Sequence, residues 1–87
     1  MATVEIYTTM FCPFCVRAKS LLNKKGVAFE EIEVDGDPAS RQQMMERSSG
    51  GYTVPQIFID DKSIGGSDEL AALERSGELD TLLQTSA

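Results

Sequence analysis

Two cysteines, Cys12 and Cys15, are the residues of this sequence best suited to covalent chemistry. Pro13 lies between them, and proline is favoured at the first position of a helix because the N–H that it lacks would be unpaired there. At such a helix start, the sulfur of Cys12 faces free backbone N–H groups and the positive end of the helix dipole, which both favour thiolate over thiol. We therefore expect Cys12 to be a redox nucleophile and Cys15, one turn further in, to be its more buried resolving partner.

The cysteines lie in a locally positive segment of an acidic protein. The net charge is −6, yet no acid occurs between Ile6 and Phe29. Arg17 and Lys19 follow the cysteines, and we expect both cations to stabilise the Cys12 thiolate. The overall charge argues against partners such as nucleic acid or an anionic membrane, and it favours basic client proteins.

Other uses of the two thiols fit the sequence less well. The chain has 2 Cys and no His, so it lacks the four ligands of a zinc site and the base of a cysteine hydrolase. We therefore expect no metal site within one chain. Residues 1–5 lack the pattern of a signal peptide, and no apolar segment is long enough to span a bilayer. We expect a cytoplasmic protein, in which a stable structural disulfide is rare.

The elements that position these residues follow from apolar spacing and turn signals. Strands are expected at residues 4–8, 28–34, 55–59 and 63–65, because these segments are rich in β-forming residues or follow a hairpin-like turn. Helices are expected at residues 13–25 and 39–47, then a last helix opened by Ser67 or Asp68, and a tail helix bearing Leu79, Leu82 and Leu83. Asp37 is expected to cap the second helix, and Gly26 to end the first.

The predicted order is β-α-β-α-β-β-α, in one domain that covers residues 1–87. A β-α-β start implies a parallel pair of strands with a right-handed crossover. The short link between the third and fourth strands implies an antiparallel pair. We therefore expect an α/β fold in which helices flank a small mixed sheet of four strands.

Four segments give the sequence a strong resemblance to the glutaredoxin family, and in particular to its bacterial dithiol class. They are residues 4–8, the Cys-Pro-Phe-Cys motif with residues 17–19, residues 53–59 and residues 64–70. A lone Cys-x-x-Cys motif is weak evidence, whereas this ordered set is highly specific. The resemblance implies a thioredoxin-like fold and glutathione as the co-substrate. It also implies an oxidoreductase that reduces protein disulfides and glutathione mixed disulfides.

The resemblance further assigns the residues that bind glutathione. They are Phe14, Thr53, Val54, Pro55, Gly66, Ser67, Asp68 and, on the second helix, Arg41 or Gln42, of which we choose Gln42. Residues 53–55 are similar to the family's cis-proline loop, whose backbone at Val54 would pair with an extended thiol peptide. The helix start after Gly66 would receive a carboxylate, and Asp68 would bind the ligand's α-amino group.

Thr9 departs from the family pattern, since many relatives carry lysine there. The Cys12 thiolate must then depend on the helix start and on Arg17 and Lys19. The resemblance also leaves two other functions open. Two chains that each donate Cys12, together with two glutathiones, could hold a [2Fe–2S] cluster, although dithiol members with proline in the motif seldom do so. Reduction by a flavoenzyme is the other alternative, and the glutathione-type segment at residues 65–68 argues against it. We expect a monomer.

Overall fold

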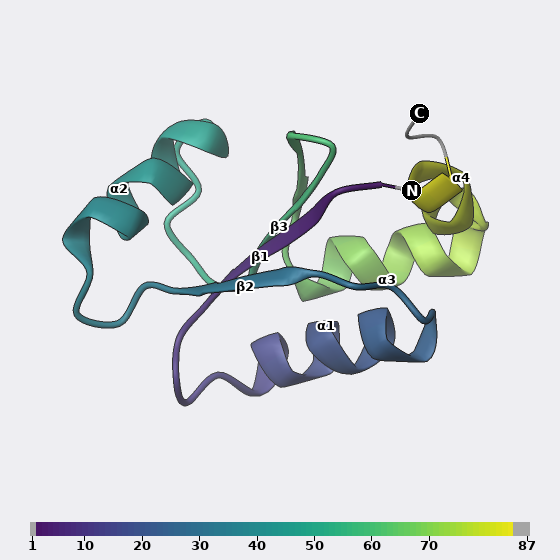
Figure 1. The fold of residues 1–87 in the computed structure, drawn as a ribbon, viewed down its shortest axis with the longest axis horizontal. Coiled ribbons are helices and arrows are strands. Elements are labelled where there is room, and N and C mark those ends of the chain that lie inside the picture. The colour runs from purple at the N-terminus through teal and green to yellow at the C-terminus, as the bar shows by residue number, and fades with distance from the viewer. Residues whose placement is uncertain (1, 85–87) are drawn as a thin grey trace.

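The computed structural model describes residues 2–84 and contains four strands and four helices over that range. In chain order they are β1 (Val4–Thr8), α1 (Pro13–Lys24), β2 (Glu30–Glu33), α2 (Pro38–Arg47), β3 (Gln56–Ile59), β4 (Lys62–Gly65), α3 (Ser67–Ser76) and α4 (Glu78–Gln84) (Figure 1). The order is the predicted one, with the tail helix present as α4. Each helix within residues 2–84 is too short or too polar to cross a lipid bilayer.

The strands form one mixed sheet in the order β2-β1-β3-β4. β1 and β2 are parallel, with Tyr7 opposite Ile32, and α1 supplies the crossover that a parallel pair requires. β1 and β3 are antiparallel, with Ile6 opposite Ile57, and β3 and β4 are antiparallel as well. The arrangement confirms the thioredoxin-like fold that the sequence predicts.

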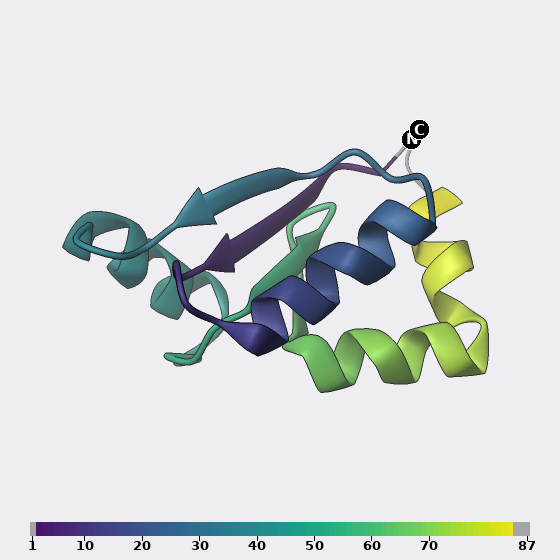
Figure 2. The ribbon, with the colours of Figure 1, turned by 90° about the horizontal axis from the view of Figure 1, so that it is seen from below.

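The main core lies on the face of the sheet that α1 and α3 cover. Figure 2 shows these two helices side by side beneath the strands. Alternation along β1 turns Val4 and Ile6 toward this face, while their neighbours Glu5 and Tyr7 turn toward the other. The buried cluster consists of Val4, Ile6, Ala18, Leu22, Ile57, Ile59, Leu70 and Leu79. It fixes α1, and therefore both cysteines, against the sheet.

The opposite face of the sheet is covered by α2. Its buried Met44 packs with Tyr7 of β1, Phe58 of β3 and Val34. The rings of Tyr7 and Phe58 meet edge to face, with centroids 5.6 Å apart and planes at 79°. This geometry is favoured because the positive edge of one ring meets the negative face of the other.

The structure differs from the prediction mainly at the ends of elements. β2 begins at Glu30 rather than at residue 28. β3 begins at Gln56, one residue later than predicted, because Pro55 has no N–H to donate to a strand ladder. α2 begins at Pro38, and Asp37 caps it as predicted, since its carboxylate accepts a hydrogen bond from Ser40 N at 3.2 Å.

Candidate active site

The two cysteines lie at the start of α1, as the sequence predicts. Cys12 is the N-cap residue, and its Sγ accepts a hydrogen bond from the backbone N–H of Cys15 at 3.0 Å. The two sulfurs form a disulfide, with the Cα atoms 5.1 Å apart. Cys12 is 8% exposed and Cys15 only 1%. The more exposed sulfur is therefore the one that a helix N–H stabilises, as a nucleophile requires.

The loop before β3 brings a carbonyl group next to the reactive sulfur. The Val54–Pro55 peptide bond is cis, which confirms the predicted cis-proline loop. The carbonyl oxygen of Val54 lies 3.9 Å from Cys12 Sγ. Pro55 is buried, whereas Val54 is only partly buried. The backbone of Val54 is thus available to a molecule that approaches Cys12.

A cavity of about 360 Å³ lies between the start of α1, the cis-proline loop and the start of α3. Its lining consists of Phe14, Thr53, Val54, Pro55, Gly66, Ser67, Asp68 and Glu69. The cavity therefore brings together every residue predicted to bind glutathione except Gln42. Glu69 is an addition that the sequence prediction missed.

Glu69 organises the start of α3. The helix begins at Ser67, one of the two predicted first residues, and Gly66 is its N-cap residue. Gly66 N–H donates to Glu69 Oε1 at 2.6 Å, which pairs the N–H of the cap residue and leaves the N–H groups of the first helical turn without a side-chain cap. Gly65 has a φ of +109°, and a Cβ there would lie 2.9 Å from the Glu69 side chain. The acid three residues after a helix cap was the sequence signal that could have identified this role.

The predicted binding residue Gln42 lies apart from this cavity. It lines a separate shallow depression on α2, together with Arg41 and Met45. Its neighbour Arg41 donates from Nη1 to the carbonyl oxygen of Tyr52 at 3.2 Å. Arg41 thus links α2 to the loop carrying Val54, whereas Gln42 forms no such hydrogen bond within residues 2–84.

The two predicted thiolate-stabilising cations have different surroundings. Lys19 Nζ lies 2.8 Å from Glu31 Oε2, so the charge of Lys19 is compensated by an acid of β2. The same hydrogen bond holds the pKa of the Glu31 carboxyl below its usual value. The Arg17 guanidinium lies 5.6 Å from the ring centroid of Phe14. Phe14 belongs to the Cys-Pro-Phe-Cys motif and lines the cavity. Of the two cations, Arg17 is the one in contact with the site.

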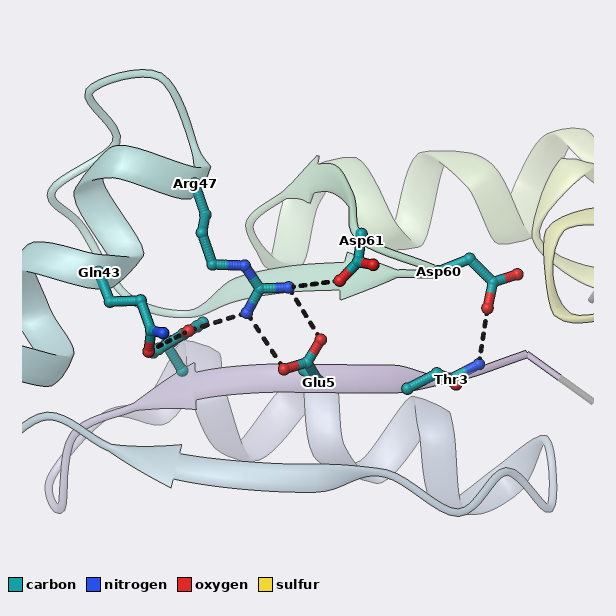
Figure 3. Close-up of polar contacts among 7 residues, drawn as sticks. Thr3, Glu5, Gln43, Arg47, Asp60 and Asp61 are labelled. Carbon is teal, nitrogen blue, oxygen red and sulfur yellow. Dashed lines mark hydrogen bonds and ion pairs between the residues drawn. The ribbon is translucent and has the colours of Figure 1, made fainter.

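A polar network on the far face of the sheet holds the end of α2 in place (Figure 3). Arg47 donates to both carboxylate oxygens of Glu5 and, at 2.8 Å, to the hydroxyl oxygen of Tyr7. It also lies 3.2 Å from Asp61 Oδ1, in the turn before β4. Gln43 accepts a hydrogen bond from the Tyr7 hydroxyl at 3.2 Å. These bonds hold the last residue of α2 against the sheet, and the loop that leads from α2 to the cavity begins there.

The glutaredoxin family model matches residues 4–64 of the chain. Glutaredoxin 3 of Escherichia coli K12 is 57% identical over 84 residues, which is 97% of this chain and 100% of that protein. The solution structure of glutaredoxin from Brucella melitensis is 52% identical, with a TM-score of 0.85 over 98% of this chain and 91% of its own. A buckwheat glutaredoxin, solved in complex with glutathione, is 29% identical, with a TM-score of 0.85 over 94% of this chain and 76% of its own.

Proposed function

The chain belongs to the glutaredoxin family and is a glutathione-dependent thiol–disulfide oxidoreductase, and we propose that Cys12 is its nucleophile and Cys15 its resolving thiol. The observation that carries this assignment is the hydrogen bond from Cys15 N–H to Cys12 Sγ, 3.0 Å long, at the start of α1. A sulfur held there is stabilised as an anion by the backbone and by the helix dipole.

On a glutathionylated protein, the Cys12 thiolate attacks the glutathione sulfur of the mixed disulfide. The new bond joins Cys12 Sγ to glutathione, and the protein leaves as a thiolate that takes up a proton. A second glutathione, as thiolate, then attacks the glutathione sulfur bound to Cys12. Glutathione disulfide is released as the oxidised product, glutathione having supplied the two electrons that reduce the protein's mixed disulfide, and Cys12 leaves as a thiolate again.

Stabilisation of the thiolate serves mainly the second of these steps. A thiol whose pKa falls from about 8.5 to about 5 gains roughly thirty-fold in thiolate at pH 7. Its intrinsic nucleophilicity falls by a similar factor, because the Brønsted slope is about 0.4–0.5. Attack by Cys12 therefore gains little, whereas its departure from a mixed disulfide becomes faster.

On a protein disulfide, Cys12 attacks one sulfur and forms a mixed disulfide with the client. Cys15 then attacks Cys12 Sγ, releases the reduced client and leaves the Cys12–Cys15 disulfide. Two glutathiones reduce this bond through a Cys12–glutathione mixed disulfide. The Cα atoms of the two cysteines lie 5.1 Å apart at the start of α1, which is within the distance that a disulfide spans and supports this route.

We propose that glutathione lies in the cavity beside Cys12, with its cysteine backbone paired to Val54. The start of α3, at Ser67, would receive its γ-glutamyl carboxylate, and Asp68 its α-amino group. The buckwheat glutaredoxin solved with glutathione supports the ligand class. A contact of Gln42 with the glycine carboxylate is the part of this proposal that the cavity lining does not support.

The roles of the cysteines are tested by two substitutions and two substrates. Cys12→Ser should lose reduction of both a glutathionylated peptide and a peptide disulfide by glutathione. Cys15→Ser should keep the first activity and lose most of the second, because only the second needs a resolving thiol. Retention of either activity by Cys12→Ser would contradict the assignment of Cys12 as the nucleophile.

We further propose a single domain over residues 1–87 that acts as a cytoplasmic monomer on glutathionylated and disulfide-containing proteins, without nucleic acid or membrane as partner. The bacterial relatives of the chain support this setting. The [2Fe–2S]-bridged dimer remains a separate prediction. Anaerobic reconstitution with iron and sulfide decides between the monomer and the cluster-bridged dimer. The proposed monomer should stay colourless and keep its sedimentation coefficient.

A further inference from the structure

The outer face of α1 carries two cations without acidic partners. Of the 8 lysines and arginines of the chain, Lys19, Lys25 and Arg47 form ion pairs. Arg17 and Lys24 are both exposed, and neither forms an ion pair with an acid of residues 2–84. In a protein with a net charge of −6, these two cations form a local positive surface along the helix that begins at the reactive cysteine.

These cations lie at a shallow depression of about 530 Å³ along α1. It is lined by Pro13, Val16, Arg17, Ser20, Leu21 and Lys24, a set that includes no acid. Val16 is 61% exposed at its surface. The depression thus combines apolar side chains with two positive charges, Arg17 one turn after Pro13 and Lys24 at the end away from Cys12.

The depression adjoins the cavity beside Cys12. Phe14 lines that cavity, and its ring centroid lies 5.6 Å from the Arg17 guanidinium, which lines the depression. Pro13, the residue after Cys12, lines the depression as well. A polypeptide whose cysteine has reached Cys12 can therefore extend along α1 without leaving the surface.

We infer that this face of α1 binds an acidic, extended segment of the client protein, and this inference rests on the proposed function. Charge complementarity is the reason, because clients that carry acids near their reactive cysteine meet Arg17 and Lys24. The net charge of the whole chain favours basic clients, whereas the surface next to Cys12 favours the opposite. Attraction at this surface would accelerate productive encounter and would weaken with salt.

The spacing of the cations fixes where the client's acids must lie. A helix rises about 1.5 Å per residue, so Arg17 lies about 7 Å and Lys24 about 18 Å along the axis from Cys12. An extended peptide covers about 3.3 Å per residue. The preferred acids are therefore about two and about five positions from the client's cysteine, on one side of it.

Lys24→Glu is the variant that tests the inference, and Lys62→Glu on β4 is its control. Both positions are exposed, and both substitutions change the net charge equally. The substrates are glutathionylated peptides with aspartates at positions two and five on either side of the cysteine, and the same peptides with asparagines. A mixed disulfide of glutathione with a small uncharged thiol reports the chemistry alone.

The wild-type enzyme should prefer one aspartate peptide over its asparagine counterpart. Lys24→Glu should lower kcat/KM for that peptide about three- to ten-fold at low salt, and Lys62→Glu less than about two-fold. Neither variant should change turnover of the small disulfide. Absence of any preference for either aspartate peptide, or equal losses in both variants, would overturn the inference. Failure of wild-type turnover on the small disulfide would instead contradict the proposed function.

Discussion

Arg47, the last residue of α2, donates hydrogen bonds to both carboxylate oxygens of Glu5 on β1. Its Nη2 lies 2.8 Å from Oε1 and its Nη1 3.1 Å from Oε2. The same guanidinium lies 4.1 Å from the ring centroid of Phe58. The hydrogen bonds with Glu5 raise the pKa of Arg47 above its usual value. Lysine cannot reproduce this combination, because it has neither a planar fork nor a flat face to stack on a ring.

Arg47→Lys should therefore lower the free energy of unfolding by about 1–2 kcal/mol, through the lost bidentate pair and the lost stacking. Urea denaturation measures the change. Arg75→Lys is the control, because Arg75 is exposed and forms no ion pair within residues 2–84. Its effect should stay within about 0.5 kcal/mol. Equal losses in the two variants would show that the Arg47–Glu5 pair contributes nothing particular.

Glu31 should make the stability of the protein depend on pH. Its Oε2 accepts hydrogen bonds from Lys19 Nζ and from Thr8 Oγ1, both 2.8 Å long, and the bond from Lys19 lowers the pKa of Glu31 below 4.5. A carboxyl whose pKa is lower in the folded state stabilises the fold above its unfolded pKa. That contribution is lost as the pH falls through the folded pKa.

Glu31→Gln should thus be less stable than the wild type at pH 7, and the difference should shrink as the pH falls below about 4.5. Urea midpoints measured from pH 7 down to the acid range give this comparison. Glu33→Gln, on the same strand and without an ion pair in the described chain, serves as the control. A difference that stays constant across the range would exclude an ionised Glu31 as its cause.

The sequence was sufficient for features that depend on neighbours along the chain. The helix start at Pro13 and the cap at Asp37 are read from local residue types, and both are present in the structure. The family pattern added the cis peptide before Pro55. Each of these requires only a few consecutive residues, or a motif that spans them.

Contacts between distant segments were not accessible in this way. The Lys19–Glu31 pair exists because β2 lies beside β1 on the face that α1 covers, and Arg47 reaches Glu5 only because α2 covers the opposite face. Gln42 was assigned to the binding site by family position, yet the turn of α2 places it in another depression. Such placements depend on the packing of whole elements, which local periodicity does not encode.

Glu69 should control the shape of the cavity beside Cys12 through its hydrogen bond with Gly66 N–H. Glu69→Gln keeps an oxygen acceptor and should change both stability and KM for a glutathione mixed disulfide only slightly. Glu69→Ala removes the acceptor and should lower stability by about 1 kcal/mol, as loss of a helix cap does. Because Gly66 lines the cavity, this variant should also raise KM more than it lowers kcat.

The comparison of the two substitutions separates hydrogen bonding from charge at this position. If the glutamine variant behaved like the alanine variant, the charge of Glu69 and not its bond to Gly66 would matter. Steady-state kinetics with a small mixed disulfide, together with urea denaturation of each variant, supply the two measurements.

Arg17 should contribute more than Lys19 to the stability of the Cys12 thiolate. Lys19 faces Glu31 at 2.8 Å, so the pair has little net charge, whereas Arg17 forms no ion pair within residues 2–84 and lies 5.6 Å from the ring centroid of Phe14. In a Cys15→Ser background, the rate of alkylation by iodoacetamide follows the thiolate of Cys12 alone. Arg17→Gln should move the midpoint of that pH profile upward by about half a unit, as expected for one exposed charge nearby, and Lys19→Gln by less. A larger shift in Lys19→Gln than in Arg17→Gln would mean that Glu31 does not compensate the charge of Lys19 at the thiolate. No shift in either variant would mean that the helix start is the main source of stabilisation of the Cys12 thiolate.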